Sequence, residues 1–151
     1  RAEIKYDPVD LTRIACRTLR MLRETEPHRV VEERIEPGLT VWGDPHLLSQ
    51  LLENLLQNAW KYSSRKGSST IEVGRKVVNG APAYFVKDNG AGFDMNYMGK
   101  LFRPFERLHG SEFEGIGIGL ATAERIVHRH GGRIWGEGVE NEGATFYFTL
   151  C

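Results

Sequence analysis

The amino-acid sequence predicts an α/β fold in a single domain. A chain of 151 residues with 40% hydrophobic residues fits one domain with an ordinary core. Several stretches have the 3.6-residue apolar period of helices, and short runs rich in branched and aromatic residues between them end at turn signals, as strands do. We therefore expect helices and strands mixed along one chain.

The charge composition argues against two classes of partner. Lysine plus arginine and aspartate plus glutamate both number 20, so no net field attracts nucleic acid or an anionic membrane. No apolar run approaches the ~18 residues of a membrane span, and no segment resembles a signal peptide. Cys16 and Cys151 lack metal-type spacing, which favours two reduced thiols in a cytoplasmic domain. Because the sequence opens on Arg1 and has no repeats, we expect a domain of a longer protein.

The amino-terminal part predicts a linker end followed by a helix. Residues 1–6 have the character of a tail or linker end, which gives a domain over 7–151. Asp10 can cap a helix over residues 11–25, where apolar side chains share one face, and Pro27 ends it.

The central prediction is one long helix over residues 44–63. Asp44 is a good N-cap and Pro45 suits the first helical position, where a missing N–H costs nothing. The helical period places one apolar arc toward the core, made of Leu48, Leu51, Leu52, Leu55, Leu56 and Ala59. The opposite, solvent side receives Ser49, Glu53, Gln57 and Trp60.

A polar stripe borders that apolar arc. Asn54, Asn58 and Lys61 fall within an arc of roughly 60° between the buried and exposed faces. Asparagine is a weak helix former, so two of them one turn apart need a reason. Amide oxygens and an ammonium group suit a hard cation with phosphates, although an incidental solvated flank is an equal reading of the helix alone.

Strand patterns flank this helix on both sides. The predicted strands are residues 30–35, 39–42, 70–78, 83–87, 133–135 and 145–150. Residues 64–69 are polar and predict a loop. Asn79-Gly80 is a strong hairpin signal between two of the strands.

Asp88 stands at the end of a predicted strand, before Gly90 and Gly92. Such a pattern is often only a turn, but residues 94–98 that follow are helix-like rather than a partner strand. The chemical alternative is a carboxylate directed out of the sheet end, with glycines that let a flat ligand approach the backbone. A carboxylate that accepts from an exocyclic amino group distinguishes adenine from guanine.

The next segment combines aromatic anchors with unassigned charge. Phe102 and Phe105 are interpreted mainly as core anchors, which leaves Arg103 and Arg107 without a structural role. Residues 108–114 are polar and aperiodic, as expected of a mobile loop.

Alternating glycines then precede a helix. Gly115, Gly117 and Gly119 lead into a predicted helix over residues 121–130, and such a loop can hold an anion with free amides and the positive end of the helix dipole. Glycine loops alone are weak indicators, and the spacing is that of neither a dinucleotide-binding motif nor a P-loop. The histidines share no ligand spacing and are interpreted as surface or cap residues: His28, His46, His109, His128 and His130.

Together these motifs resemble the N, G1, F, G2 and terminal glycine boxes of the catalytic, ATP-binding domain of sensor histidine kinases. The motifs are Asn54-x-x-x-Asn58-Ala-x-Lys61-Tyr62-Ser63, Asp88-x-Gly90-x-Gly92, Phe102-x-Pro-Phe105, Gly115-x-Gly117-x-Gly119-Leu120 and Gly143-x-Thr145. The resemblance covers residues 7–150, and the stretch 102–135 is most similar to kinases attached to phytochrome-type and PAS-type sensors. Five motifs in the right order are far more specific than any one.

The resemblance implies a Bergerat fold, a two-layer α/β sandwich whose mixed sheet has helices packed on one face, with ATP and Mg²⁺ as cofactors. It assigns Asn58 to the Mg²⁺ ion, Asn54 to the phosphate and metal shell, Lys61 to phosphate and Tyr62 to a place beside the adenine. Asp88 would accept from the adenine amino group. The remaining implied nucleotide-binding positions are Gly90, Gly92, Gly115, Gly117, Gly119, Leu120 and Thr145. Arg103 and Arg107 are candidates for the γ-phosphate on charge and position.

One departure from the family limits the expected activity. The phosphoacceptor box, a histidine followed closely by an acidic residue or Asn, Arg and Pro, is absent from every histidine here. The resemblance therefore implies a monomeric ATP-binding half of a histidine kinase. Its partners would be a phosphoacceptor and dimerisation domain of the same protein and a response regulator.

Two alternatives remain. DNA gyrase, mismatch-repair ATPases and heat-shock chaperones of the same superfamily place a water-activating Glu where this chain has Asn54, and the neighbouring Glu53 lies about 140° around the helix from Asn58. The second alternative is a degenerate domain that docks regulators without chemistry.

Overall fold

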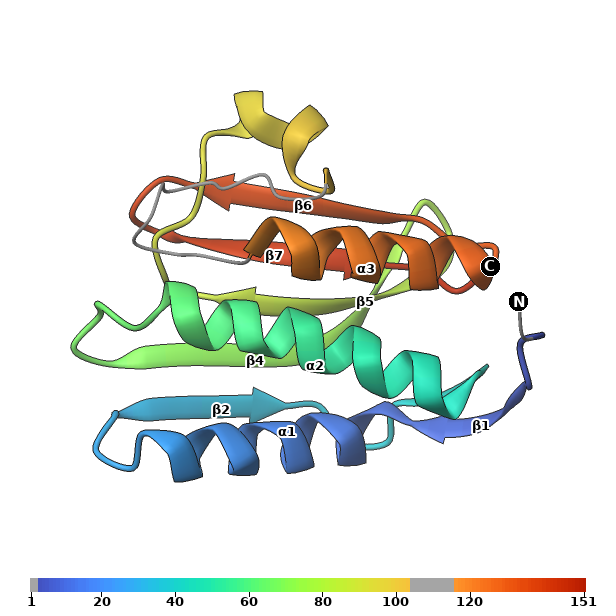
Figure 1. The fold of residues 1–151 in the computed structure, drawn as a ribbon, viewed down its shortest axis with the longest axis horizontal. Coiled ribbons are helices and arrows are strands. Elements are labelled where there is room, and N and C mark those ends of the chain that lie inside the picture. Colours follow the sequence, from blue (N-terminus) through green and yellow to red (C-terminus); the bar gives the residue numbers. More distant parts are fainter. Residues whose placement is uncertain (1–2, 104–115) are drawn as a thin grey trace.

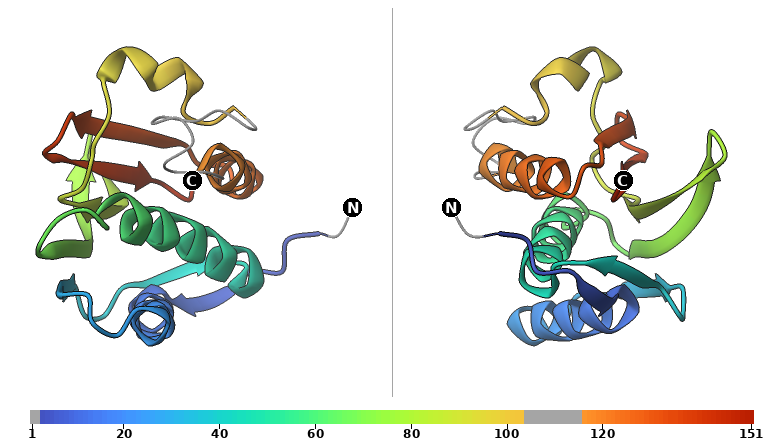
Figure 2. Two further views of the ribbon diagram at one scale, coloured as in Figure 1. Left: turned by 60° about the vertical axis from the view of Figure 1, so that its left-hand side comes forward. Right: turned by 90° about the vertical axis from the view of Figure 1, so that its right-hand side faces the viewer.

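The structure, a computed structural model, describes residues 3–103 and 116–151, without the side chains of 116–119. Its main sheet has five strands in the order β2 (Val31–Ile35), β4 (Ser69–Val78), β5 (Ala81–Asp88), β7 (Gly143–Phe148) and β6 (Ile134–Val139). β2 pairs with β4 in parallel, and the other neighbours are antiparallel. Helices α1 (Leu11–Thr25), α2 (Pro45–Tyr62) and α3 (Ile116–Arg129) lie side by side on one face of this sheet (Figures 1 and 2). The expected two-layer sandwich with a mixed sheet is confirmed.

Capping residues fix the starts of the first two helices, as expected. The Asp10 carboxylate accepts from the Arg13 amide at 2.9 Å at the start of α1. Asp44 accepts from the amides of His46 and Leu47 at 3.0 and 3.1 Å at the start of α2. Both helices begin at the predicted residues because these caps satisfy amides that have no partner inside the helix.

The apolar arc of α2 forms the centre of the core. All six predicted apolar positions of the arc are at most 3% exposed. The assignment of Trp60 to the solvent side is wrong, because it is only 4% exposed and the segment after α1 covers it. Ser49 and Glu53, also expected to face solvent, are half-buried.

A second, two-stranded sheet was not expected. β1 (Asp7–Asp10) pairs antiparallel with β3 (Thr40–Gly43), and the Tyr6 ring stacks on Trp42 with 6.3 Å between the ring centroids. Only Val9 of β1 is buried, so four residues carry no alternating pattern that could reveal the strand. Residues 5 and 6, expected to be a linker end, contact the domain: the Lys5 amide donates to the Asp44 carboxylate at 3.1 Å.

The carboxyl-terminal third differs from expectation at its boundaries. α3 begins at Ile116 rather than at 121, and the 3₁₀ helix η1 (Met95–Lys100) replaces the short helix expected over 94–98. The hairpin turn at Asn79 and Gly80 is confirmed, with φ values of 52° and 80°. The loop 108–114, expected to be mobile, lies outside the described residues.

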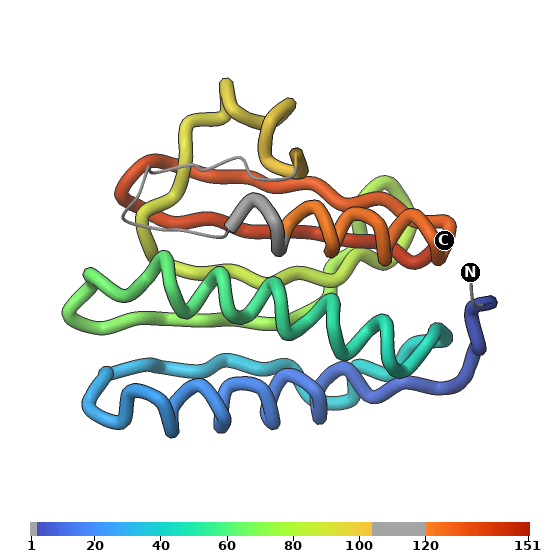
Figure 3. The backbone as a smooth tube through the Cα atoms, viewed as in Figure 1, coloured from blue at the N-terminus to red at the C-terminus, as the bar shows by residue number. Residues whose placement is uncertain are grey.

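His130, expected on the surface or at a cap, is a buried link between two helices. It is 5% exposed, and its Nε2 accepts from the Asp44 amide at 3.1 Å, which leaves Nδ1 to donate to the Ile126 carbonyl at 2.8 Å. This hydrogen bond joins the end of α3 to the start of α2. These two ends lie close together because the helices run in opposite directions (Figure 3).

Candidate functional site

Two of the three members of the polar stripe of α2 lie on the border of the buried face, as predicted, and the third is buried. Asn54 and Lys61 are half-buried, whereas Asn58 is only 8% exposed. The Asn58 Nδ2 atom is buried and has no hydrogen-bond partner among the described residues. A buried amide nitrogen without a partner costs free energy, so this position has an unsatisfied donor that a bound acceptor group could satisfy.

Asp88 ends β5, as expected, and is 6% exposed. Burial raises its pKa to about 7, although hydrogen bonds from the Gly90 and Ala144 amides oppose the rise. The Gly90 amide donates to Oδ1 at 2.8 Å. A carboxyl group buried in this way, without a counter-ion among the causes of its pKa, is the kind of acceptor that marks a binding site.

The loop after β5 packs directly on the last turn of α2. The Ala91 amide donates to the Tyr62 carbonyl at 3.0 Å, and a Cβ on Gly90 would lie 2.3 Å from that same oxygen. Gly92 has φ +64°, and a Cβ there would meet the Val139 carbonyl at 2.0 Å. Both glycines are therefore required by close backbone approach, independently of any ligand.

Tyr62 joins the two halves of the site. It is 7% exposed, and burial raises the pKa of its hydroxyl, with a further contribution from the negative charge of Asp88. The structure thus brings together Tyr62, Asp88, Gly90 and Gly92, with Asn58 and Lys61 in the adjoining turns of α2.

The glycine motif is described only in part. Gly117 and Gly119 lie in the first turn of α3, so their expected loop conformation is wrong, while Gly115 lies outside the described residues. α3 begins at the same end of the molecule at which α2 finishes (Figure 1). The amino-terminal amides of α3 and the positive end of its dipole therefore lie toward the end of α2 that contains Asn58 and Lys61.

Leu120, assigned to the nucleotide by the resemblance, is 1% exposed and belongs to the hydrophobic core cluster. It therefore helps to pack α3 in the core rather than facing open space.

The structure does not bring Thr145 to this site. The register pairs Thr145 with Lys87 and Ala144 with Asp88. Since successive side chains of a strand point to opposite faces, Thr145 lies on the sheet face opposite Asp88. Sequence reasoning missed Ala144, the residue opposite the carboxyl group, because it needs the register of two distant strands.

The arginine candidates are not placed against the other residues. Arg103 is exposed at the end of the first described segment, and Arg107 lies outside the described residues. No group of three or more His, Cys, Asp or Glu side chains among residues 3–103 and 120–151 could hold a metal ion.

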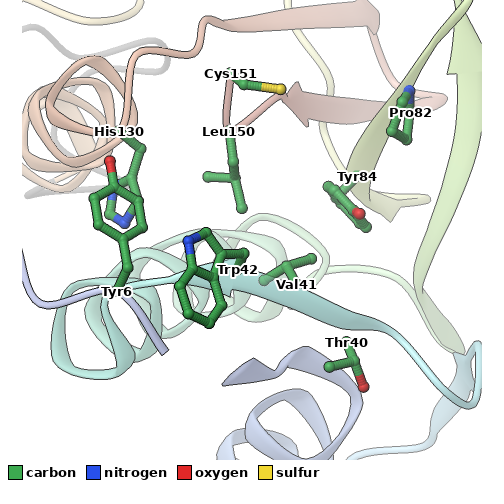
Figure 4. A pocket seen from close by; sticks show the side chains of 9 residues that line it. All are labelled: Tyr6, Thr40, Val41, Trp42, Pro82, Tyr84, His130, Leu150 and Cys151. Carbon is green, nitrogen blue, oxygen red and sulfur yellow. The ribbon is translucent and has the colours of Figure 1, made fainter. Parts of the chain in front are cut away.

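A cavity of about 560 Å³ lies at the other end of the molecule and contains none of the predicted site residues (Figure 4). Tyr6, Trp42, Tyr84 and Cys151 are among its lining residues. Within the described part of the chain, no helix is both long and apolar enough to cross a membrane.

Comparison with known proteins gives consistent matches. The family model described as histidine kinase-, DNA gyrase B-, and HSP90-like ATPase matches residues 43–151. Cyanobacterial phytochrome B of Nostoc sp. is 39% identical over 155 residues, which covers 99% of this chain. The chain spans only 20% of the length of that relative.

Solved structures show the same fold. The mycobacterial sensor histidine kinase MprB has a TM-score of 0.78 at 25% identity, covering 95% of this chain and 97% of that chain. Full-length ShkA in complex with AMPPNP has a TM-score of 0.78 at 23% identity, covering 97% of this chain and 31% of that chain. The chain therefore belongs to the histidine kinase-, DNA gyrase B- and HSP90-like ATPase family, and its fold is that of the catalytic domains of sensor histidine kinases.

Proposed function

We propose that this domain binds Mg-ATP and supplies the γ-phosphoryl group to a histidine on a separate dimerisation domain in two-component signalling. The observation that carries the proposal is the buried carboxyl of Asp88 beside the last turn of α2, with the Asn58 amide nitrogen, which has no partner among the described residues, one turn earlier. One group suits a nucleobase and the other the phosphate end of the same ligand.

Asp88 is the proposed selector of the base. Its carboxylate accepts from the 6-amino group of adenine, whereas guanine would oppose a carbonyl oxygen to it. The site has no room to move away from that repulsion, since Gly90 and Gly92 are held against the Tyr62 and Val139 carbonyls. Tyr62 is proposed to flank the ring.

The asparagine stripe is the proposed phosphate end. Lys61 neutralises phosphate charge, and the amides at the start of α3 favour an anion. The residues present fit a Mg²⁺ ion through the amide oxygens of Asn58 and, one turn away, of Asn54, because Mg²⁺ prefers oxygen ligands. The Asn58 Nδ2 atom, which has no partner among the described residues, suits donation to a phosphate oxygen. When bound, Mg²⁺ would screen the charge of the phosphate oxygens.

Transfer to a side chain is favoured over hydrolysis. Asn54 stands where the gyrase-like and chaperone-like members of the family carry a base, and an amide cannot take a proton from water. Without a base, water is a poor nucleophile, which supports a histidine acceptor. A Bergerat-fold ATPase or serine kinase, and a domain that only docks regulators, are the alternatives. The phosphoacceptor domain, the response regulator and the cytoplasmic location expected from the resemblance are part of the proposal.

Calorimetric titration tests the binding half of the proposal. We expect ATP and ADP to bind with a Mg²⁺-dependent affinity. GTP should bind at least about tenfold more weakly, because the free-energy cost of a mismatched buried hydrogen bond corresponds to a change in affinity of about that size. Asn58→Ala should remove most of the Mg²⁺ dependence. Gln57→Ala, on the exposed side of the same turn, is the matched control and should change nothing.

Equal affinity for GTP and ATP would contradict the role of Asp88. An unchanged metal response in Asn58→Ala would remove that residue from the metal site, while leaving the base assignment in place.

A further inference from the structure

Arg29, which lies between α1 and β2, makes an extensive set of contacts with the last turn of α2. Its Nη1 donates to the Trp60 carbonyl at 2.7 Å, and its Nη2 donates to the hydroxyls of Ser63 and Ser69 at 3.2 and 2.8 Å. The arginine side chain is 11% exposed. One guanidinium group thus connects the end of α2 to the start of β4.

A ring and a carboxylate hold this guanidinium in place. Its Cζ lies 4.3 Å from the centroid of the Trp60 ring, and Nη1 lies 3.9 Å from the Glu26 carboxylate. The same carboxylate accepts from the Trp60 indole N–H at 2.9 Å. Burial lowers the pKa of Arg29, but an arginine stays charged, and a cation at a helix carboxyl terminus is favourable.

The turn that Arg29 holds is the one on which the base site is built. Ser69 donates to the Ser63 carbonyl at 2.8 Å, and Ser63 donates to the Ala59 carbonyl at 2.7 Å. Tyr62, between the bonded positions 60 and 63, accepts from the Ala91 amide at 3.0 Å. Arg29 therefore holds the residues on both sides of Tyr62, at positions 60 and 63.

The loop that carries Asp88 is tied to the same strand start. Asn89 accepts from the Thr70 amide at 2.9 Å and donates to the Ser68 carbonyl at 3.0 Å. The end of α2, the start of β4 and the loop after β5 thus form one closed network of hydrogen bonds, in which Arg29 supplies three.

We propose that Arg29 is a positioning residue for the base site: it sets the distance between Tyr62 and Asp88 and so determines adenine affinity and the discrimination against guanine, without touching the nucleotide. This inference rests on the proposed function. The guanidinium group is essential, because its planar array of donors reaches all three acceptors at once: the Trp60 carbonyl and the hydroxyls of Ser63 and Ser69. A lysine ammonium on a flexible side chain cannot bind all three from one position.

The chain offers a matched control in Arg23. Arg23 also belongs to the α1 region and pairs with a carboxylate, that of Glu33, while its Nη2 donates to the Val31 carbonyl at 2.6 Å. These contacts join α1 to β2 and do not involve α2. Arg23→Gln therefore removes an ion pair and a hydrogen bond to a backbone carbonyl at a distance from the base site.

The experiment compares ADP and GDP affinities of the unaltered chain, Arg29→Gln, Arg29→Lys and Arg23→Gln by calorimetry, well below each melting temperature. Arg29→Gln should weaken ADP binding by roughly tenfold with little change for GDP, since charge-assisted hydrogen bonds that orient the base site are lost. Arg29→Lys should recover only part of the loss. Arg23→Gln should bind ADP as the unaltered chain does.

Amide hydrogen exchange distinguishes a local effect from general destabilisation, because it compares the protection of the Ala91 amide with that of amides in the main sheet. In Arg29→Gln the Ala91 amide should lose protection by roughly tenfold or more relative to the amides of β6 and β7. Arg23→Gln should leave this ratio unchanged.

The outcomes separate the inference from the proposed function. If the unaltered chain binds ADP and Arg29→Gln lowers only the melting temperature, with affinity, discrimination and Ala91 protection unchanged, Arg29 is purely structural. If the unaltered chain does not bind ADP, the proposed function is wrong and the base-site role of Arg29 is overturned with it, whatever the Ala91 exchange shows.

Discussion

Asp88 is a residue whose burial works against the stability of the folded chain. The unfolded carboxyl releases its proton near the ordinary pKa of 3.8, while the folded one retains it up to about 7. Between these values the folded state binds more protons than the unfolded state, so its free energy of unfolding falls as the pH rises. Two backbone amides only partly offset this cost.

We therefore predict that Asp88→Asn stabilises the nucleotide-free domain while abolishing adenine discrimination. The gain should be near zero at pH 4 and should reach up to about 4 kcal/mol at pH 8, because asparagine cannot ionise and can still accept from the Gly90 amide. Urea unfolding at pH 5 and pH 8 measures it.

Asp94→Asn is a suitable control. Asp94 accepts a hydrogen bond from a backbone amide, as Asp88 does, but it lies at the start of η1 and is only half-buried. A stabilisation by Asp88→Asn that is the same at both pH values would contradict the assigned role of ionisation.

The sequence predicted the positions of single candidate site residues where one local period was enough. Asn58 follows from a helical wheel and Asp88 from the end of a strand pattern, and both lie where expected. The solvent-side assignment of Trp60 was wrong, because its environment comes from the distant Arg29 region. The sheet face of Thr145 could not be derived from sequence, because it depends on the β5–β7 register.

At the scale of elements, α2 is held at both ends. Asp44 at its start accepts three backbone amides, including that of Lys5, and His130 accepts the amide of Asp44 itself. Burial opposes ionisation of Asp44, yet these amides, with His130, lower its pKa below the ordinary value. Its stabilisation is therefore present above the ordinary pKa and is lost as the pH falls through the folded value.

Asp44→Ala should lower the free energy of unfolding at pH 7 by about 1–2 kcal/mol, as expected for loss of an N-cap. ADP affinity should not change, because the cap lies at the opposite end of α2 from Tyr62. Chemical denaturation and calorimetry measure the two effects.

Asp44→Asn keeps an acceptor oxygen at the cap and should lose much less stability than Asp44→Ala. A weaker ADP affinity in Asp44→Ala at unchanged stability would show that the two ends of α2 are coupled.

Element boundaries were predictable where a cap defines them. α1 and α2 begin at the predicted residues because Asp10 and Asp44 cap them. The start of α3 was not predictable from the sequence. Its glycines disfavour a helix locally, whereas burial in the core of the face that contains Leu120 and Ala123 favours one.

At the scale of the whole molecule, the chain holds an ATP-binding fold without a recognisable phosphoacceptor histidine box. It spans 20% of the length of the phytochrome that it resembles. The order of the motifs made the sandwich predictable, since five spaced motifs define one topology. The two-stranded sheet and the cavity at Tyr6 could not be predicted, because each depends on packing between chain segments without a motif.

We predict that the isolated chain hydrolyses ATP very slowly and does not label itself with γ-phosphate. It should phosphorylate a histidine on a separately supplied dimerisation domain, since Asn54 provides no base for water. Radiolabelled ATP with and without that domain tests this, with a His→Gln variant of the added domain as control. Rapid hydrolysis by the pure chain would favour the ATPase alternative.

The placement of Tyr6 and Cys151 around one cavity, far from the proposed base site, has a practical consequence for the order of the chain segments. We expect that a short peptide could join the segments at Tyr6 and Cys151, and that the chain could be reopened at the exposed Asn79–Gly80 turn. Such a circular permutant keeps every pair of neighbouring strands and loses only the covalent turn between β4 and β5. The two halves of the chain are then synthesised in the reverse order. If such a permutant folds, the order of the segments in this sequence is one of several orders that can encode the same arrangement of strands.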